Sequence, residues 1–573
     1  MRSRSGRRGA GALVAALLML AETAGAAPAA NPAPPGRAGE AEAAMRHERR
    51  RLIERLGRRA GFDPLPQGLP SYQVFANLER KGDLTRSTRP VDPPDAHGVI
   101  RRLAELPCSA RDGEAEAAWL LRAAWGVDAA PVWSVGLAAL EAGTLYGRPL
   151  RELTQALRSA DLLPSLDELM EADPAVAQYP TLFAPAAGAL VSWVLEEHGT
   201  AGLRRAVLAT VKPRGRSEVL ARSLGMADRL LGEAYARALG PAAGRPPRHT
   251  SKRAAAVPPG MQRGVCYAHT VSLERGYASR QSERNLDTLA AIGINWISVT
   301  PFGYLELHSP EIAASSAFGP DAETDESLAA VLQQASARGL RVLVKPHLWS
   351  TDFVGRIRMR SDQDWRRFFL AYSRYIAHHA VLAEACGASA LCVGNELIEA
   401  TRGRDPQWRT LIAAARALFS GPLTYGAHWD EEVERIGFWD ALDWVGVSLY
   451  APLATDTRAG PAEWRAAAHR QSERLVAIAR RAGKPLVLVE AGFPSHPRAP
   501  LAPWEVPQDG PADSAVQAQA FLALLEAFGS RPEVKGIYWW KWFTDEPPPP
   551  GDRTHRFAGK PAEQILRRFY PGR

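Results

Sequence analysis

The chain has 573 residues, of which 46% are hydrophobic and 23% charged, and its formal net charge is +8. This length exceeds what one hydrophobic core usually organises, so we expect at least two folded units. The composition is typical of globular protein and excludes a largely disordered chain or a bundle of membrane spans. Basic residues are spread among acidic ones instead of gathering in a patch, so no nucleic-acid partner is predicted.

The first 26 residues have the pattern of an export signal. Four arginines precede an apolar run from Ala10 to Leu20, and Ala24 to Ala26 form a small-residue cleavage site. The run is well short of the roughly 20 residues that a membrane span needs, and no other window approaches that length. We expect residues 1–26 to be removed on export to the periplasm or the medium. The net charge then falls to +5, because four Arg and one Glu are lost.

Composition divides the rest of the chain into further parts. Residues 27–39 are rich in Ala and Pro, as in a disordered leader. Residues 40–239 carry apolar residues at helical spacing and few alternating β-branched runs, which predicts a mainly α-helical N-terminal domain. Residues 240–260 hold five prolines in a basic, Gly-containing stretch, which indicates a linker.

Cysteine is scarce in this chain. Its four cysteines, Cys108, Cys266, Cys386 and Cys392, are too few for a dense disulfide framework, and their spacing fits no zinc site. One bridge is compatible with them, for example between Cys386 and Cys392, but it is not required. No cofactor and no bound metal are predicted.

Residues 261–573 change to short apolar strands that alternate with amphipathic helices. The predicted strands are Gly264–Ala268, Ile294–Phe302, Arg341–Trp349, Ala390–Leu397, Leu423–Trp429, Asp443–Tyr450, Pro485–Phe493 and Val534–Trp542. Eight successive βα units in about 310 residues predict an α/β fold, a (β/α)8 TIM barrel. Only about 13 residues separate the fifth strand from the sixth, so one short helix is expected there. A doubly wound open sheet is the alternative, and it is less favoured because eight parallel units commonly close.

The carboxyl ends of barrel strands form one mouth, so the residues that end the strands are the candidates for a site. Glu396 ends the fourth strand and Glu490 the seventh, and both follow apolar runs in which a carboxylate needs compensation. The residues expected to bind substrate are Lys345, His347, Trp349, Asn395, Trp429, Tyr450, Trp540 and Trp542. Hydrolysis of a glycosidic bond with retention needs an acid to protonate the leaving oxygen and a carboxylate to attack the anomeric carbon. Glu396 and Glu490 are predicted to be this catalytic pair, and Tyr450 is either a hydrogen-bond donor to the nucleophile or a rim residue.

Other interpretations of the same residues stay open. Either glutamate could form a structural ion pair with Lys345 or Lys541, and any single tryptophan could serve packing alone. A metal-dependent barrel hydrolase could use His269, His347 and His428, with Lys345 as a further candidate, although the first strand lacks the His-x-His pair expected of such enzymes. The non-enzymatic alternative is a carbohydrate-binding or cell-envelope scaffold.

Several motifs in the C-terminal unit resemble those of glycoside hydrolase clan A, whose members carry Asn-Glu at the end of strand four and Glu at the end of strand seven. The chain has these residues in 394–397 and 489–492. More narrowly, the segments Val344–His347, Trp408–Ile412, Leu423–Trp429, Phe438–Gly446 and Tyr538–Trp542 resemble glycoside hydrolase family 113.

That family is associated with β-mannan hydrolysis, and the resemblance covers roughly Arg263 to Tyr570. It implies that Glu396 is the general acid/base, that Glu490 is the nucleophile, and that Asn395 donates to the sugar hydroxyl beside the anomeric carbon. We therefore expect an exported, metal-independent glycosidase acting by double displacement on a β-linked polysaccharide or oligosaccharide, with β-mannan first.

The helical domain carries a second resemblance. Residues Ala130–Ala138 and Ala184–Ala206 resemble segments of gluzincin metallopeptidases, but Val135 stands where those enzymes carry a glutamate ligand. No His-Glu-x-x-His motif occurs in Glu114–Leu121. The resemblance implies a peptidase-like domain without zinc, kept for packing or binding, and an unrelated helical bundle is the alternative.

Overall fold

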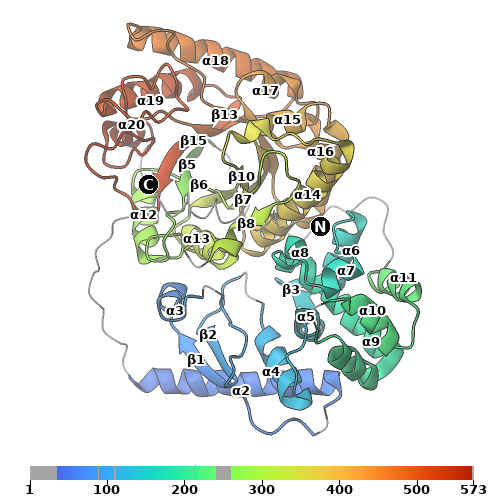
Figure 1. Cartoon of the computed structure of the whole chain (residues 1–573). Coiled ribbons are helices and arrows are strands. Elements are labelled where there is room, and N and C mark those ends of the chain that lie inside the picture. Colours follow the sequence, from blue (N-terminus) through green and yellow to red (C-terminus); the bar gives the residue numbers. More distant parts are fainter. Residues whose placement is uncertain are drawn as a thin grey trace.

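The computed structural model describes residues 35–62, 64–87, 89–108, 111–212, 214–240, 260–319 and 321–570. The predicted export signal, residues 27–34 of the predicted leader and residues 241–259 of the predicted linker lie outside these described residues. Two packed units fill the described part: an N-terminal unit, residues 35–240, and a barrel, residues 261–570 (Figure 1). Within these ranges, no helix has the length and apolar character needed to cross a membrane.

The C-terminal unit is a closed barrel of eight parallel strands, which confirms the predicted fold class. In chain order the strands are β5 (Gln262–Ala268), β6 (Trp296–Val299), β9 (Arg341–Val344), β11 (Ala390–Asn395), β12 (Leu423–His428), β13 (Trp444–Leu449), β14 (Leu486–Ala491) and β15 (Val534–Phe543). β15 pairs with β5, and this pairing closes the ring. The open doubly wound sheet is thereby excluded.

Helices surround the barrel on its outer side (Figure 1). They are α12 (Arg280–Ala291), α13 (Asp325–Ala337), α14 (Asp362–Ala385), α15 (Ile398–Thr401), α16 (Asp405–Leu418), α18 (Pro461–Ala482), α19 (Ser514–Phe528) and α20 (Pro561–Phe569), with the short 3-10 turns η1 (Ser315–Phe318) and η2 (Val354–Arg356). The short connection between β12 and β13 holds only α17 (Glu431–Arg435) and η3 (Trp439–Ala441), as its length predicts. Side-chain caps mark several helix starts: the Ser279 hydroxyl accepts from the amide of Ser282, for example.

Two of the predicted strands are each divided in two. β6 is followed after Pro301 by β7 (Phe302–Tyr304), and β9 is followed after Pro346 by β10 (His347–Trp349). Proline has no N–H to donate to a strand ladder, so the barrel pairing stops at these positions. β10, β7 and β8 (Ala313–Ala314) then form a separate three-stranded sheet beyond the ends of β6 and β9.

The N-terminal unit is mainly helical, as predicted. Its helices are α2 (Pro35–Ala60), α3 (Leu78–Thr85), α4 (Glu114–Trp125), α5 (Pro131–Ala142), α6 (Leu150–Ser159), α7 (Leu166–Met170), α8 (Pro174–Ala177), α9 (Pro180–Ala209), α10 (Arg216–Ser223) and α11 (Asp228–Ala238). Two small sheets, which the sequence reasoning missed, join them: parallel β1 (Ser71–Phe75) and β2 (Val99–Leu103), and the hairpin β3 (Thr144–Leu145) and β4 (Arg148–Pro149).

One predicted boundary of this unit needs correction. α2 begins at Pro35, so residues 35–39 are helical and are not part of a disordered leader. Proline suits the first turn of a helix, where its missing N–H has no helical partner, and the following Ala and Glu residues favour helix. The gluzincin-like identity of the unit stays a prediction; its residue Val135 lies in α5, which packs against α9.

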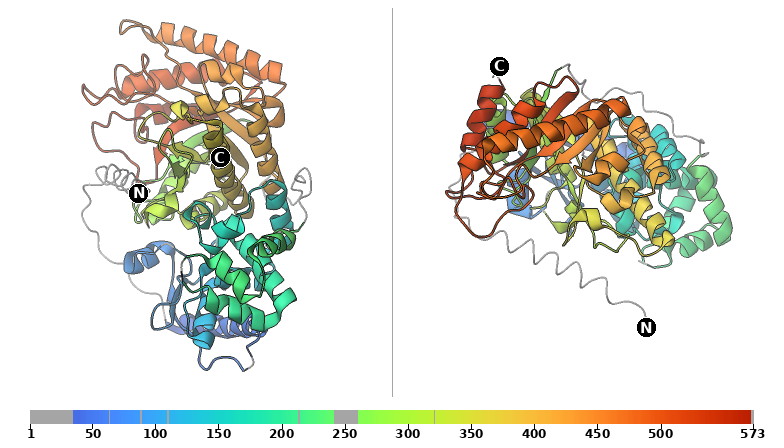
Figure 2. Two further views of the ribbon diagram at one scale, coloured as in Figure 1. Left: turned by 45° about the vertical axis from the view of Figure 1, so that its right-hand side comes forward. Right: turned by 90° about the horizontal axis from the view of Figure 1, so that it is seen from above.

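The two units pack against each other (Figure 2), and a disulfide and polar contacts join them. Cys108 forms a disulfide with Cys386, at the end of α14. The suggested pair of Cys386 with Cys392 is therefore wrong, because Cys392 points into the barrel interior from β11 and is a free, buried thiol. Arg374 on α14 also binds both carboxylate oxygens of Glu168 on α7, at 2.8 and 3.1 Å.

Loss of the disulfide should destabilise the whole chain. Cys108→Ser removes a cross-link between residues 278 positions apart, and we expect the free energy of unfolding to fall by about 2–4 kcal/mol, since such a bond restricts the unfolded chain. Denaturant unfolding with and without reductant measures this. Reductant should lower the midpoint of the unsubstituted protein and leave that of Cys108→Ser unchanged; equal midpoints for the reduced and oxidised protein would contradict the expectation.

Candidate active site

Glu490 lies at the end of β14 at the centre of a set of polar contacts. Its Oε1 accepts from Lys345 Nζ and from Asn395 Nδ2, the latter at 3.2 Å, and lies 3.3 Å from His347 Nε2. Its Oε2 accepts from the Tyr450 hydroxyl at 2.8 Å. Burial alone would raise the pKa of Glu490, but the charge of Lys345 and the contact with His347 hold it well below the ordinary range. This carboxyl group is therefore ionised at neutral pH.

Glu396 lies at the end of β11 in a special backbone conformation. Its φ is +53°, in the left-handed region that a non-glycine residue rarely adopts. The amide of Glu396 donates to the Gly426 carbonyl at 2.8 Å, and the amide of Leu397 donates to the Tyr425 hydroxyl at 2.8 Å. Such strain costs about 1–3 kcal/mol and persists where the surroundings hold it. Here those two bonds fix the direction in which the Glu396 side chain leaves the strand.

The electrostatic environment of Glu396 is opposite to that of Glu490. Desolvation in the barrel mouth, followed by the charges of Glu490 and Glu432, raises the pKa of Glu396 well above its usual range. No side-chain cation in the described residues forms an ion pair with it. Glu396 is therefore protonated when Glu490 is ionised, and two carboxyl groups with pKa values pushed apart are suited to act as acid and nucleophile.

The side chain of Asn395 is fixed by hydrogen bonds to Ser448 and Glu490. Its side-chain oxygen accepts from the Ser448 hydroxyl at 2.9 Å, which directs its amide nitrogen toward Glu490. Glycine at position 426 makes room for this arrangement, because a Cβ there would lie 2.2 Å from Asn395 Oδ1. The amide of Asn395 is thus fixed beside Oε1 of Glu490.

Sequence reasoning missed the residues that support this arrangement. Glu432 in α17 accepts from the Tyr425 hydroxyl at 2.8 Å, from Thr401 at 2.9 Å and from the amide of His428 at 2.7 Å. Ser448 was missed as well. Glu432 lies in the short connection between two strands and not at a strand end, so no periodic pattern marked it. Ser448 is one residue before the end of β13. It would have been found if every inward-facing residue of each strand had been considered, and not only the last ones.

The predicted aromatic residues occupy different places. The ring of Trp540 is partly exposed and parallel to that of His347, with 6.3 Å between the two centroids. Trp349, at the end of β10, lies 5.8 Å from the ring of Tyr304. Trp429 follows β12 and packs against His428 at 5.4 Å. Trp349 and Trp429 are both partly exposed, so each can present a face to a sugar.

Trp542 does not belong to this group, which corrects the prediction. It is 2% exposed, its indole nitrogen donates to Asn285 on α12 at 3.0 Å, and its ring packs on Phe557. The register of β15 against β5 shifts between Trp539 and Trp542. Because such an irregularity reverses which side chains face inward, Trp540 points into the mouth and Trp542 into the helical layer.

Lys345 was predicted to contact substrate, and this too needs correction. Its side chain is completely buried beneath the mouth, where it bonds to Glu490 and to the carbonyl of Val489. A buried lysine that is bonded to Glu490 positions that carboxylate and exposes no surface to a sugar. Tyr450 is buried and donates from its hydroxyl to Glu490 Oε2, so it is not a rim residue.

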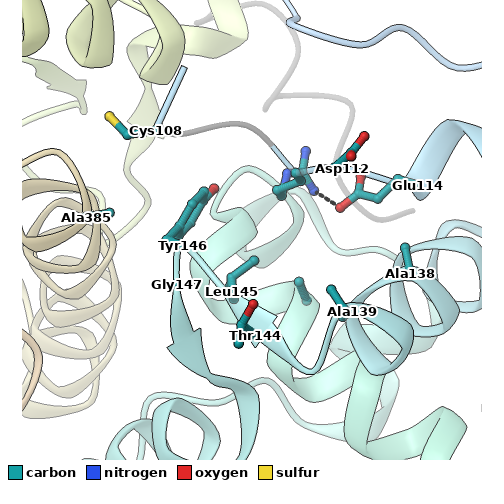
Figure 3. A pocket seen from close by; sticks show the side chains of 13 residues that line it. Cys108, Asp112, Glu114, Ala138, Ala139, Thr144, Leu145, Tyr146, Gly147 and Ala385 are labelled. Atoms are coloured by element: carbon teal, nitrogen blue, oxygen red, sulfur yellow. Dashed lines mark hydrogen bonds and ion pairs between the residues drawn. The ribbon is translucent and has the colours of Figure 1, made fainter. Parts of the chain in front are cut away.

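The histidines do not form a metal centre in the described residues, where no group of three or more His, Cys, Asp or Glu side chains is placed to hold an ion. Both ring nitrogens of His269 are engaged with backbone groups, at Asp321 and Tyr277. A hollow of about 370 Å³ elsewhere, between the N-terminal unit and α14, contains the Arg111–Glu114 ion pair and mostly small side chains (Figure 3). It includes none of the predicted site residues.

Removal of the buried cation gives a test of this electrostatic arrangement. In Lys345→Met the pKa of Glu490 should rise, because burial is no longer opposed by a charge, so the acidic limb of the kcat/KM profile should move to higher pH. At neutral pH we expect a loss of about tenfold for each unit by which the raised pKa exceeds the assay pH, since only the ionised form of Glu490 is active. Lys535→Met, at an exposed position of the same barrel, is the matched control and should keep the original profile. An unshifted acidic limb in a folded Lys345→Met protein would show that Lys345 does not control Glu490.

A closed (β/α)8 barrel with one ionised and one protonated carboxyl group at its strand ends defines a class of protein, the barrel glycoside hydrolases. Comparison with known families agrees: residues 266–552, half of the chain, match the model of Glycoside Hydrolase Family 113. The chain belongs to that family.

Three solved structures are similar to this chain. The family 113 β-mannanase AaManA from Alicyclobacillus acidocaldarius, in complex with ManMIm, is 28% identical over 54% of this chain and 97% of its own, with a TM-score of 0.48. Two structures described as family 113 β-1,4-mannanase are 25% and 24% identical, cover 55% of this chain and 100% of theirs, and have TM-scores of 0.48 and 0.49. Among curated proteins no match is found.

Proposed function

We propose that the chain is a retaining glycosidase that cleaves β-linked polysaccharide or oligosaccharide. This proposal rests on one observation: two carboxyl groups at the same barrel mouth have surroundings that favour opposite protonation states. Glu490 receives hydrogen bonds from Lys345, Asn395 and Tyr450, whereas desolvation and neighbouring carboxylates keep Glu396 protonated. This is the division of roles that double displacement requires.

In the first step Glu490 attacks the anomeric carbon as the bond to the leaving oxygen breaks, and Glu396 gives its proton to that oxygen. A covalent glycosyl ester of Glu490 results. In the second step Glu396, now ionised, takes a proton from water as the water oxygen attacks the same carbon, and Glu490 leaves as a carboxylate. Two inversions give net retention, and Glu396 serves first as acid and then as base.

β-Mannan is the first substrate to test, because of the motifs that the chain shares with family 113, which is associated with β-mannan hydrolysis. The loops of a barrel set the sugar specificity, so the fold alone does not decide it. Trp349, Trp429 and Trp540 present partly exposed aromatic faces at the mouth, and such faces suit the apolar sides of sugar rings.

Export of the protein is part of the same proposal. The basic, apolar and small-residue pattern of residues 1–26 supports it. A disulfide between Cys108 and Cys386 also supports it, because such bonds form and persist in oxidising compartments.

Hydrolysis of β-mannan and of a panel of other β-glycans by the mature protein, in the presence of EDTA, tests the proposal. Product release from one of them, with the β-anomer formed first in an NMR time course, is the expected result. An α-anomer formed first would contradict retention. Tight binding to a glycan without any turnover would instead support a carbohydrate-binding scaffold.

A further inference from the structure

The turn between α8 and α9 of the N-terminal unit contacts a sheet of the barrel mouth. Gln178 in this turn donates from Nε2 to the carbonyl of Ile312 at 2.9 Å, and its Oε1 accepts from the amide of Ala314 at 2.8 Å. A donor and an acceptor on one side chain thus bond to the backbone of β8 as a neighbouring strand would. Figure 1 shows α8 on the side of the N-terminal unit that faces the barrel.

The strand that Gln178 contacts belongs to a sheet whose far strand, β10, carries residues of the candidate active site. β8 pairs with β7 at Gly303 and Tyr304, and β7 pairs with β10 along its whole length. The two ends of β10 are His347, whose ring lies 3.3 Å from Glu490, and Trp349. Gln178 is therefore at the outer edge of a sheet whose inner edge carries two of the residues predicted to bind substrate.

The residue after Gln178 is connected to the same sheet at another strand, β10, through Tyr375. Tyr179 is buried and packs its ring on His378 at 5.3 Å and on Tyr375 at 6.5 Å. The hydroxyl of Tyr375 donates to the carbonyl of Pro301 at 2.7 Å and lies 3.0 Å from the carbonyl of His347. Gln178 thus bonds at the outer edge of the sheet, and Tyr179 contacts a tyrosine that bonds to its inner edge.

The dimensions of the sheet explain why it needs such support. β8 has two residues and β7 and β10 have three each, far fewer than the five or six of a typical strand. Few ladder hydrogen bonds hold strands this short, so bonds from outside contribute a large share of their order. The turn itself is fixed, since the Thr181 hydroxyl and Asp325 each lie 2.9 Å from a ring nitrogen of His378.

We propose that the N-terminal unit forms part of the substrate-binding wall, and that Gln178 is a positioning residue that holds the β10-β7-β8 sheet, with His347 and Trp349, in the geometry that binds sugar. The proposal rests on the proposed glycosidase function for its kinetic consequence. Its structural part, the ordering of the sheet by Gln178, does not depend on that function.

Gln178→Ala in the full chain tests the proposal. Backbone amide hydrogen exchange in residues 302–314 and 347–349 should become at least about tenfold faster, because the two hydrogen bonds from Gln178 to the β8 segment are lost. With a glycan that the unsubstituted protein cleaves, KM should rise about five- to tenfold while kcat changes by less than about twofold, since binding is affected more than chemistry. Gln178→Glu should be at least as damaging, because it places a carboxylate oxygen against the carbonyl of Ile312.

Two controls separate this effect from general loosening. Gln155→Ala removes the same side chain from an exposed position of α6, and Glu168→Gln weakens the ion pair between the units away from the sheet. Both should leave exchange in the sheet and KM unchanged. The proposal is overturned if either control reproduces the Gln178→Ala effect, if Gln178→Glu behaves like the unsubstituted protein, or if exchange and KM do not rise together in Gln178→Ala. If no glycan is cleaved, the proposed function fails, and unchanged exchange alone then overturns the positioning role.

Discussion

Glu490→Ala is expected to lower kcat/KM by about 10⁴-fold or more on any glycan that the unsubstituted protein cleaves, because loss of a covalent nucleophile removes the intermediate altogether. Glu490 is 3% exposed and bonded to Lys345, Asn395 and Tyr450, so no neighbouring carboxylate can take its place without rearrangement. Initial rates on the polysaccharide and on an aryl β-glycoside measure the loss. Glu505→Ala, which removes a half-exposed glutamate of the loop after β14, is the control and should retain full activity.

Azide supplies a sharper version of the same experiment. In Glu490→Ala the vacated space beneath the anomeric carbon should admit azide, which attacks an activated aryl β-glycoside and displaces the phenolate in one step. The carbon–oxygen bond breaks as the carbon–nitrogen bond forms, so the product is an α-glycosyl azide. A β-glycosyl azide from this variant would place the nucleophile elsewhere and contradict the assignment.

The eight βα units could be predicted from the sequence because each barrel strand is a short apolar run flanked by an amphipathic helix. The division of two strands at Pro301 and Pro346 was visible in principle, since proline interrupts a ladder wherever it occurs. The disulfide was not predictable, because Cys108 and Cys386 lie 278 residues apart and meet only through the packing of the two units. Long-range contacts of this kind leave no local pattern.

In the candidate site too, local sequence patterns located some residues, whereas the positions of others depend on long-range packing. Strand ends locate Glu396, Glu490, Asn395 and Tyr450, because a barrel brings those ends to one mouth. Periodicity could not reveal that Trp542 faces outward, since the parity of β15 changes at an irregularity that depends on pairing with β5. The burial of Lys345 likewise follows from the packed barrel interior and not from its neighbours in the sequence.

Glu396→Ala should have an effect that depends on the leaving group. On a polysaccharide, whose leaving oxygen needs a proton, we expect kcat/KM to fall by about 10²- to 10⁴-fold, the usual contribution of a general acid. On an aryl β-glycoside with an acidic phenol, departure needs no proton, so the first step should be nearly unaffected and the glycosyl ester of Glu490 should accumulate. A burst of phenol followed by slow turnover, together with the intact ester in mass spectrometry, would establish this.

The pH dependence adds a second criterion for Glu396. Because its pKa is raised, the group stays protonated through the neutral range, and activity on polysaccharide should fall only as the pH rises through that pKa. This basic limb should be absent from Glu396→Ala, whereas the acidic limb set by Glu490 should remain. Glu399→Ala, which alters an ion-paired glutamate three residues away in α15, should keep both limbs. A basic limb that persists in Glu396→Ala would assign the proton donor to another group.

Azide should rescue Glu396→Ala with a β-glycosyl azide as product, because azide then attacks the glycosyl ester of Glu490 and gives a second inversion.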